Sequence, residues 1–207
     1  MDTFRTLARP ANAEPPKTKG SRFLGEAVPV STERAALDAV EAIRKREHAA
    51  THVCWAVRLG ADGALTRSAD DGEPSGTAGA PILREIEGRD LTDCLVAVTR
   101  YYGGTKLGAG GLARAYGEAA AAALVAARVR TVVVRVPVTL GFAFDDTAAA
   151  MRLLDRFDAE VADQTYSPDG TRLVLRVRLS EAGALADAFV EATSGRGGVE
   201  GPGTRGR

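Results

Sequence analysis

The 207-residue sequence has few cysteines and no long apolar run, and each of these shortages argues against a class of protein. Its two cysteines, Cys54 and Cys94, lie in apolar strand-like runs, which predicts buried reduced thiols rather than a disulfide or a reactive nucleophile. No apolar run is long enough to span a membrane. The N-terminus also lacks the apolar core of a signal peptide, so we expect a cytoplasmic protein.

An excess of charge of one sign is also missing, because 27 basic residues balance 27 acidic residues. The balance holds on both sides of Arg128, so neither part of the chain has a net field that would gather polyanions at long range. Any anionic partner must therefore be held by a local cluster. The content of 45% hydrophobic and 26% charged residues is ordinary for a soluble globular protein.

The hydrophobic pattern predicts an α+β protein with two domains. We expect a flexible leader over 1–20, a first domain over 21–128, a second domain over 131–200 and a disordered tail over 201–207. In the first domain, the predicted strands are 21–30, 51–59, a short one near 65 and 94–99, and the predicted helices are 33–48, 81–87 and 112–128. In the second domain, strands at 131–144, 159–167 and 171–179 and helices at 145–157 and 180–193 give the order β-α-β-β-α. This order is one strand short of a ferredoxin-like sandwich, and only 197–201 could supply the missing strand.

The most informative stretch is VTRYYGGTKLGAGGLARAY, at 98–116, in which a strand-like run is followed by glycines around Lys106. The glycines are Gly103, Gly104, Gly108, Gly110 and Gly111. Glycine is favoured where φ is positive or where backbone must approach another group closely. Converging N–H groups and the positive end of the following helix can bind an anion, with Arg100, Lys106 and Arg114 adding charge. The alternative is a structural connection in which the glycines only let helix and sheet approach.

An acidic loop, DDGEPSGTAG, precedes this stretch and places Asp70, Asp71 and Glu73 within four residues. Such carboxylates repel one another unless a cation or hydrogen-bond donors meet them. They could bind a metal, contact a ligand, act as acid and base, or pair with the basic loop while capping the helix at Pro81. Because no histidine or further carboxylate stands at ligand spacing, we predict no metal and no cofactor.

Ser75 and Thr77 are the candidate nucleophiles for a hydrolase that acts on a small anionic or peptide substrate at this cleft. A nucleophilic hydroxyl needs a base within hydrogen-bond reach, and the sequence has only His48 and His52. We therefore assign no catalytic residue and expect binding rather than catalysis. The hydrolase and a protein-interaction module stay as alternatives.

A second basic surface is predicted in the second domain. On the strand at 171–179, leucine and valine side chains share one face and arginines share the other. The arginines of this surface are Arg172, Arg176 and Arg178, with Arg135 on the long strand at 131–144. Such a face suits a phosphate backbone, although it lacks the paired aromatics that stack RNA bases. A solvated face is the alternative.

The two long motifs, with SRF at Ser21 and ATHVCWAVRLG from Ala50, resemble the IMPACT family, whose bacterial branch includes YigZ. The resemblance covers about 21–128. It implies a first domain of the ribosomal protein S5 domain 2-like type, a mixed sheet with helices on one face, and a ferredoxin-like second domain. Eukaryotic members regulate translation, and for bacterial members the resemblance implies contact with nucleic acid or the ribosome.

We therefore expect a non-enzymatic, translation-associated regulator that binds nucleic acid or a ribosomal surface and has no membrane partner. The sequence does not specify its oligomeric state. We expect the surface to combine the glycine loop with Arg100, Lys106 and Arg114. Asp70, Asp71 and Glu73 would orient these basic side chains or contact donors on the ligand. The contact would extend over Arg135, Arg172, Arg176 and Arg178.

Overall fold

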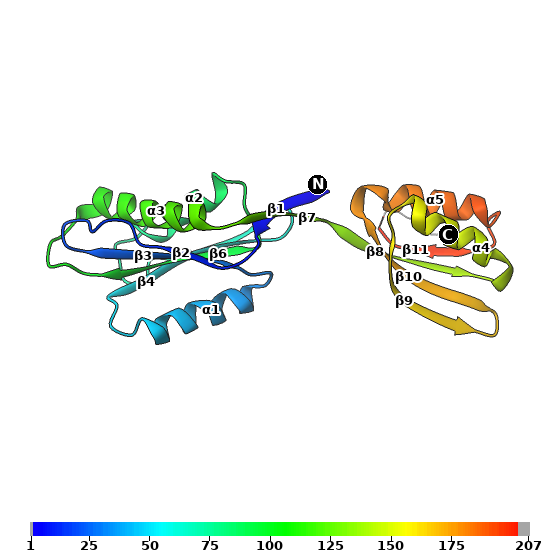
Figure 1. The fold of residues 1–207 in the computed structure, drawn as a ribbon, viewed down its shortest axis with the longest axis horizontal. Coiled ribbons are helices and arrows are strands. Elements are labelled where there is room, and N and C mark those ends of the chain that lie inside the picture. Colours follow the sequence, from blue (N-terminus) through cyan, green and yellow to red (C-terminus); the bar gives the residue numbers. More distant parts are fainter. Residues whose placement is uncertain (1, 203–207) are drawn as a thin grey trace. The chain divides into compact units, whose positions relative to one another are not determined.

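The computed structural model describes residues 2–202, which form two compact units (Figure 1). The N-terminal unit comprises residues 4–132, and the C-terminal unit comprises the chain from 133 onward with residues 2–3. No helix in this described part is long and apolar enough to cross a membrane. Of the predicted disordered tail at 201–207, residues 203–207 lie outside the described residues.

The N-terminal unit is built on a five-stranded sheet with the order β2-β3-β6-β4-β5, in which every pairing is antiparallel. Its strands are β2 (Ala11–Ala13), β3 (Arg22–Pro29), β4 (His52–Leu59), β5 (Leu65–Ala69) and β6 (Cys94–Tyr101). Its helices are α1 (Glu33–Arg46), α2 (Gly79–Glu87) and α3 (Gly108–Ala126). Helix α1 lies on one face of the sheet, and α2 and α3 lie on the other (Figure 1).

Helices on both faces, and an antiparallel sheet, correct the mixed sheet with one covered face that the family resemblance implies. The reason lies in the central strands β4 and β6, whose side chains are buried on both sides. Cys54 and Val98 pack toward α2 and α3, whereas Trp55 and Leu95 pack toward α1. Both cysteines are free and buried, as the sequence predicts.

Helix α3 lies directly on β3 because most of its buried residues are alanines. A Cβ atom added at Gly25 would stand 2.2 Å from the carbonyl oxygen of Ala119, so only glycine fits there. The helix begins at Gly108, four residues before the predicted start at Leu112. The last glycines of the loop therefore belong to the first turn of the helix.

The predicted flexible leader is instead structured over most of its length. Strand β1 (Thr3–Leu7) pairs with β7 (Val129–Val133), and β2 pairs with β3. Leu7 is fully buried, and the hydroxyl of Thr6 donates a hydrogen bond to the carbonyl of Asp93 at 3.0 Å. The prediction was wrong because both strands are short and β1 is held by segments distant in sequence.

The C-terminal unit has the ferredoxin-like topology. Its elements are β8 (Arg135–Phe142), α4 (Thr147–Arg156), β9 (Glu160–Ser167), β10 (Gly170–Arg178), α5 (Ala182–Ala192) and β11 (Gly198–Glu200), with 3-10 turns at Phe144–Asp146 and Leu179–Glu181. The sheet has the order β11-β8-β10-β9 and is antiparallel. Strand β11 supplies the last strand from the glycine-rich segment, and the long predicted strand at 131–144 is divided into β7 and β8.

The close contact of α3 with β3 gives a first prediction. The substitution Gly25→Ala should destabilise the fold by about 1–3 kcal/mol, because the added methyl group would overlap the backbone of α3. Gly117→Ala is the matched control on α3: its Cβ would meet nothing closer than 3.8 Å, so it should stabilise the fold by about 0.5–1 kcal/mol. Urea denaturation measures both, and equal effects would contradict the proposed contact.

Candidate functional site

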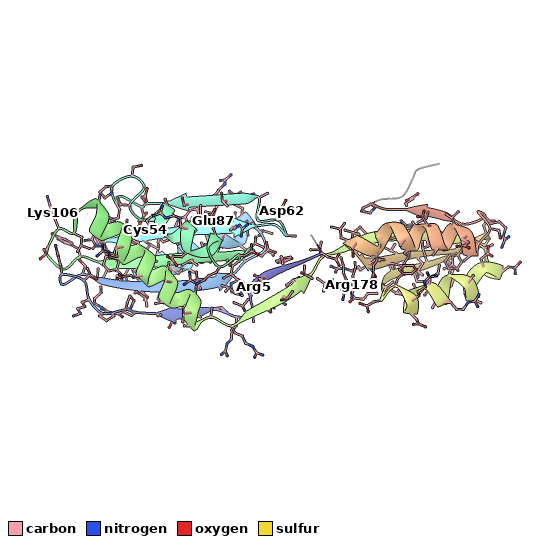
Figure 2. All side chains as sticks on the ribbon, turned by 90° about the horizontal axis from the view of Figure 1, so that it is seen from above. Arg5, Cys54, Asp62, Glu87, Lys106 and Arg178 are labelled. Atoms are coloured by element: carbon pink, nitrogen blue, oxygen red, sulfur yellow. The ribbon has the colours of Figure 1, made fainter. Side chains whose placement is uncertain are left out.

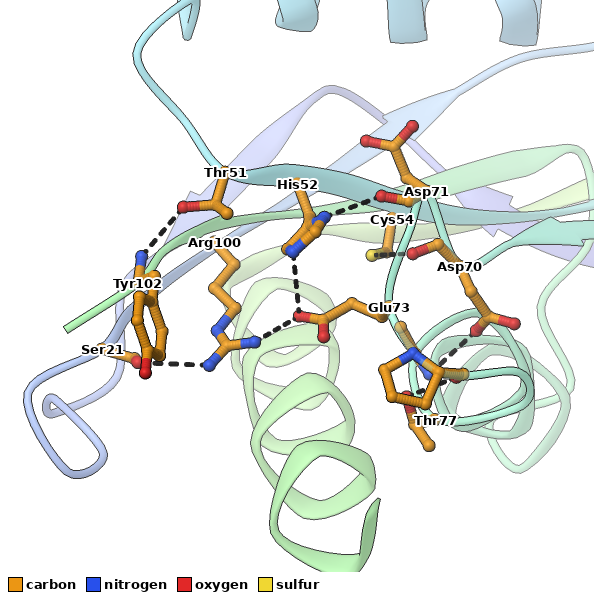
Figure 3. A network of polar contacts seen from close by, with 12 residues as sticks. Ser21, Thr51, His52, Cys54, Asp70, Asp71, Glu73, Thr77, Arg100 and Tyr102 are labelled. Atoms are coloured by element: carbon orange, nitrogen blue, oxygen red, sulfur yellow. Dashed lines mark hydrogen bonds and ion pairs between the residues drawn. The ribbon is translucent and has the colours of Figure 1, made fainter. Parts of the chain in front are cut away.

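A buried ion pair joins the acidic loop to the end of β6 (Figure 3). Nη1 of Arg100 lies 2.5 Å from Oε1 of Glu73, and the two side chains are only 6% and 4% exposed. The hydroxyl of Tyr116 on α3 donates to the same oxygen at 2.7 Å. The guanidinium also lies over the rings of Phe23 and Tyr102, at 5.5 and 5.3 Å from their centroids. Because buried charges are stable only when paired, Arg100 and Glu73 stabilise each other.

Asp70 caps the start of α2 from outside the helix. Its carboxylate accepts hydrogen bonds from the backbone N–H groups of Gly76, Ala78 and Gly79 at 2.8, 3.0 and 2.8 Å. Burial disfavours the charged carboxylate, but these three donors outweigh it and hold the pKa of Asp70 below its usual value. Asp70 therefore stays ionised and fully engaged with the backbone.

Asp71 connects the acidic loop to β4 and α1. Its carboxylate accepts a hydrogen bond from the N–H of Val53 at 2.7 Å and pairs with Arg44 at 2.5 Å. Its carbonyl accepts a hydrogen bond from Nδ1 of His52 at 2.7 Å, which leaves Nε2 of that ring 3.9 Å from Glu73. The acidic loop is thus fastened to its neighbours by side chain and backbone alike.

Two further side chains define the chemistry of this region. Cys54 donates a hydrogen bond to the carbonyl of Asp70 at 3.0 Å, and burial raises the pKa of its thiol to about 12, so it is no nucleophile. The hydroxyl of Thr77 donates to the carbonyl of Pro74 at 2.6 Å, which is a turn contact. Helix α1 ends at Arg46, before either histidine, so the two histidines do not share a helix.

The three acidic residues therefore form a structural network within the N-terminal unit. Each carboxylate meets donors of the chain itself, which is the alternative that the sequence left for this loop. Within residues 2–202, no group of three or more His, Cys, Asp or Glu side chains is placed to hold a metal ion.

The glycine loop between β6 and α3 is exposed to solvent from Gly103 to Lys106. Gly103 has a structural role, because a Cβ atom there would stand 2.0 Å from the carbonyl carbon of Gly20. Its N–H donates to the hydroxyl of Ser21 at 3.1 Å. In residues 2–202, the N–H groups of 104–107 find no hydrogen-bond partner.

The other glycines of the loop are subject to different constraints on backbone conformation and packing. Gly104 and Gly108 have positive φ values of 86° and 72°, which favour glycine whatever the surroundings. Gly111 is closely packed, with its Cβ position 3.2 Å from Leu107. Gly110 has neither constraint, because it is helical and a Cβ atom would meet nothing within 4 Å. Helix α3 also starts without a side-chain cap at Leu107.

Of the three predicted cations of this region, one is buried and two are exposed. Arg100 points inward to Glu73 and is 5% exposed, which corrects its expected role in the basic surface. Lys106 extends from the loop before α3 (Figure 2), and Arg114 is exposed on the next turns of that helix. Alternation along β6 could assign Arg100 to a face of the sheet but could not identify Glu73 as its partner.

The four arginines predicted for this surface lie on the sheet of the C-terminal unit, but only two of the four make no ion pair in the described part of the chain. Arg172 and Arg176 are exposed on β10, opposite the face that buries Leu173 and Leu175. Arg135 and Arg178 instead pair with Asp158, at 2.8 and 3.8 Å, and Arg135 also pairs with Glu160 at 3.3 Å. The face therefore carries mixed charge.

Sequence reasoning missed Tyr116, His52 and Ser21 as members of the polar network. Tyr116 gave a usable signal, because a phenol on the buried stripe of an alanine-rich helix needs a polar partner. The contact of Ser21 with Gly103 has no such signal, since it joins segments 82 residues apart.

The fold and this site define a class of two-unit α+β proteins, with an antiparallel sheet unit carrying an acidic loop and a glycine loop, followed by a ferredoxin-like unit. The chain belongs to the IMPACT family. The family model of the Impact N-terminal domain matches residues 19–124, which contain both loops.

Several known proteins are similar to this chain. An IMPACT family member in the pol 5′ region of Thermus thermophilus is 42% identical over 182 residues, covering 87% of this chain and 98% of that protein. YigZ of Escherichia coli is 33% identical over 166 residues, covering 79% and 80% of the two chains. A solved structure, described only as the crystal structure of an hypothetical protein, covers 96% of this chain and 97% of its own with a TM-score of 0.73 and 27% identity.

The buried pair gives a second prediction. Arg100→Ala and Glu73→Ala should each destabilise the fold by about 3–5 kcal/mol, because each leaves a buried charge without its partner. The double variant should lose less than the sum of the two losses. Chemical denaturation of all four proteins gives the coupling energy, and strict additivity would show that the two residues do not depend on each other.

The cap at Asp70 gives a third prediction. Because folding lowers its pKa, its ionised form stabilises the fold above the usual value of 3.8, and that stability is lost as the pH falls through the folded value. Asp70→Asn should therefore lower the free energy of unfolding by about 1 kcal/mol at neutral pH. The difference from the unsubstituted protein should shrink below pH 3.8, and a difference independent of pH would contradict the cap.

Proposed function

We propose that this protein is a non-enzymatic, translation-associated regulator that binds nucleic acid or a ribosomal surface through its glycine-rich loop. Membership of the IMPACT family supports the translation-associated role, and such a role would be carried out in the cytoplasm. The binding mode is supported by the geometry of the loop and of the first turn of α3.

Gly110 is the observation that carries this binding mode. Glycine inside a helix destabilises it by about 0.5–1 kcal/mol relative to alanine. Neither a positive φ nor a close neighbour explains glycine at this position, and Gly110, unlike the equally unconstrained Gly117, lies in the first turn of α3. A group from outside the protein that approaches the helix backbone closely would explain it. The first four N–H groups of a helix have no partner within the helix, and their partial positive charge favours an anion.

The neighbouring residues support an anion as that group. The N–H groups of 104–107 are free within the described residues, and Lys106 is exposed beside them. Phosphate oxygens are suitable acceptors for both. The exposed Arg172 and Arg176 would supply a separate phosphate contact on the C-terminal unit.

The engaged acidic loop supports binding rather than catalysis. A general acid at neutral pH needs a raised pKa, whereas the pKa of Asp70 is lowered by its three backbone donors. Asp71 and Glu73 are each held by an arginine. These residues fix the shape of the region on which the glycine loop is mounted.

RNA binding tests the proposal directly. Lys106→Ala should weaken binding of a labelled single-stranded RNA and reduce the slope of log K against log salt by about 1. Gly110→Ala should also weaken binding, since its methyl group would occupy the space of the phosphate, although the fold should become more stable. Fluorescence anisotropy at several salt concentrations measures both.

Two matched controls accompany these variants. Lys45→Ala removes a lysine on α1 that pairs with Glu41, and Gly117→Ala changes a glycine of α3 outside its first turn. Both should leave RNA affinity unchanged. If Lys106→Ala and Gly110→Ala bind RNA as tightly as the unsubstituted protein, the loop is not the binding site.

Recovery from a cell lysate separates the proposed function from the alternatives. Ribosomal material should copurify with the protein, and treatment with nuclease should release it if the contact is to RNA. Copurification of a partner that resists nuclease and does not respond to Lys106→Ala would instead indicate a protein-interaction module.

A further inference from the structure

The chain uses lysine very sparingly, with four lysines among its 27 basic residues. They are Lys17, Lys19, Lys45 and Lys106. Arginines make most of the ion pairs within residues 2–202, whereas Lys17, Lys19 and Lys106 make none there. Lys45 differs from these three, because it pairs with Glu41 at 2.6 Å. Three of the four lysines are therefore exposed and unpaired in the described chain.

The fold brings the hairpin that carries Lys19 next to the glycine loop. Thr18 and Ser21 exchange backbone hydrogen bonds at 2.9 and 3.0 Å, which closes a two-residue hairpin at Lys19 and Gly20. The tip of this hairpin lies against the loop, since a Cβ atom at Gly20 would stand 2.9 Å from the carbonyl oxygen of Gly103. Lys19 directly precedes Gly20 in the sequence, and Lys106 follows Gly103 by three residues.

The conformation of Lys19 indicates that the turn did not select it. Both residues of the hairpin have positive φ, 46° for Lys19 and 84° for Gly20, as a type I′ turn requires. Asparagine is preferred at the first of these positions, and a lysine there is strained. We therefore expect that Lys19, whose side chain is exposed to solvent, has a role other than forming the turn.

Glu14 is the acidic residue nearest to the hairpin in the sequence. Glu14 pairs with Arg22 at 2.7 Å, and Arg22 and Lys17 both lower the pKa of its carboxyl. Lys19 and Lys106 meet no carboxylate in the described residues. The charge of these two lysines is thus available to a partner, and Lys17 is partly balanced by Glu14.

We infer that the Thr18–Ser21 hairpin and the glycine loop form one phosphate-binding surface for an RNA strand, with Lys19 and Lys106 as its principal cations and Lys17 beside them. This inference rests on the proposed function and adds the hairpin to it. Exposed ammonium groups on separate loops, at the end of long flexible side chains, suit phosphates spaced along a strand better than one small anion. Phosphate contacts of this kind are independent of base sequence.

The decisive variant is Lys19→Asn, measured in the full chain with a labelled oligouridylate as the probe. It removes the charge and supplies the residue that the turn prefers, so the melting temperature should be unchanged or higher. Affinity for the RNA should fall, and the slope of log K against log salt should decrease by about 1, as for one lost phosphate contact. Lys19→Asn combined with Lys106→Ala should reduce the slope by about 2.

Three comparisons make the result decisive. Lys19→Arg should keep the slope, because it keeps the charge, and Lys45→Ala should bind like the unsubstituted protein. If the unsubstituted protein binds RNA and Lys106→Ala weakens it, but Lys19→Asn does not, this inference is overturned while the proposed function stands. If the unsubstituted protein does not bind the RNA at all, the proposed function fails and this inference fails with it.

Discussion

The ion pair between Arg100 and Glu73 is the interaction on which the functional region depends. It joins the end of a central strand to the acidic loop, and Tyr116 adds α3 to the same carboxylate. One buried contact thereby joins a strand, a loop and a helix. It also explains why an acidic motif and a basic glycine motif occur together: one residue of each is the internal partner of the other.

The arginines and the lysines of the N-terminal unit therefore have different roles. Arginine, with its planar group of donors, is matched to carboxylates and holds the unit together at Arg44 and Arg100. The lysines of the hairpin and of the glycine loop are exposed to solvent. A protein without net charge can in this way keep a few exposed cations, because many of its arginines are paired with its carboxylates.

Much of the architecture could be predicted from the sequence because it is recorded in local patterns. Alternation of leucine with arginine located β10 and its buried face, and the order of elements indicated the ferredoxin-like unit. The predicted start of α3 was too late in the sequence, because glycine has a low helix propensity. Strands β1 and β2 were missed because their pairing depends on distant segments. For the site, exposure of Lys106 followed from the sequence, but the inward direction of Arg100 required knowledge of a loop 27 residues away.

The contact of Gly25 with the backbone of Ala119 has a mechanical consequence for helix α3 of the N-terminal unit. A helix seated that closely on a strand has no room to slide along it or to lift without opening the core. Helix α3 is therefore held in one position on the sheet at Ala119. If the glycine loop binds RNA as proposed, docking beside such a fixed helix would order mainly surface side chains, so that the rate of encounter, rather than a rearrangement of the protein, would limit association.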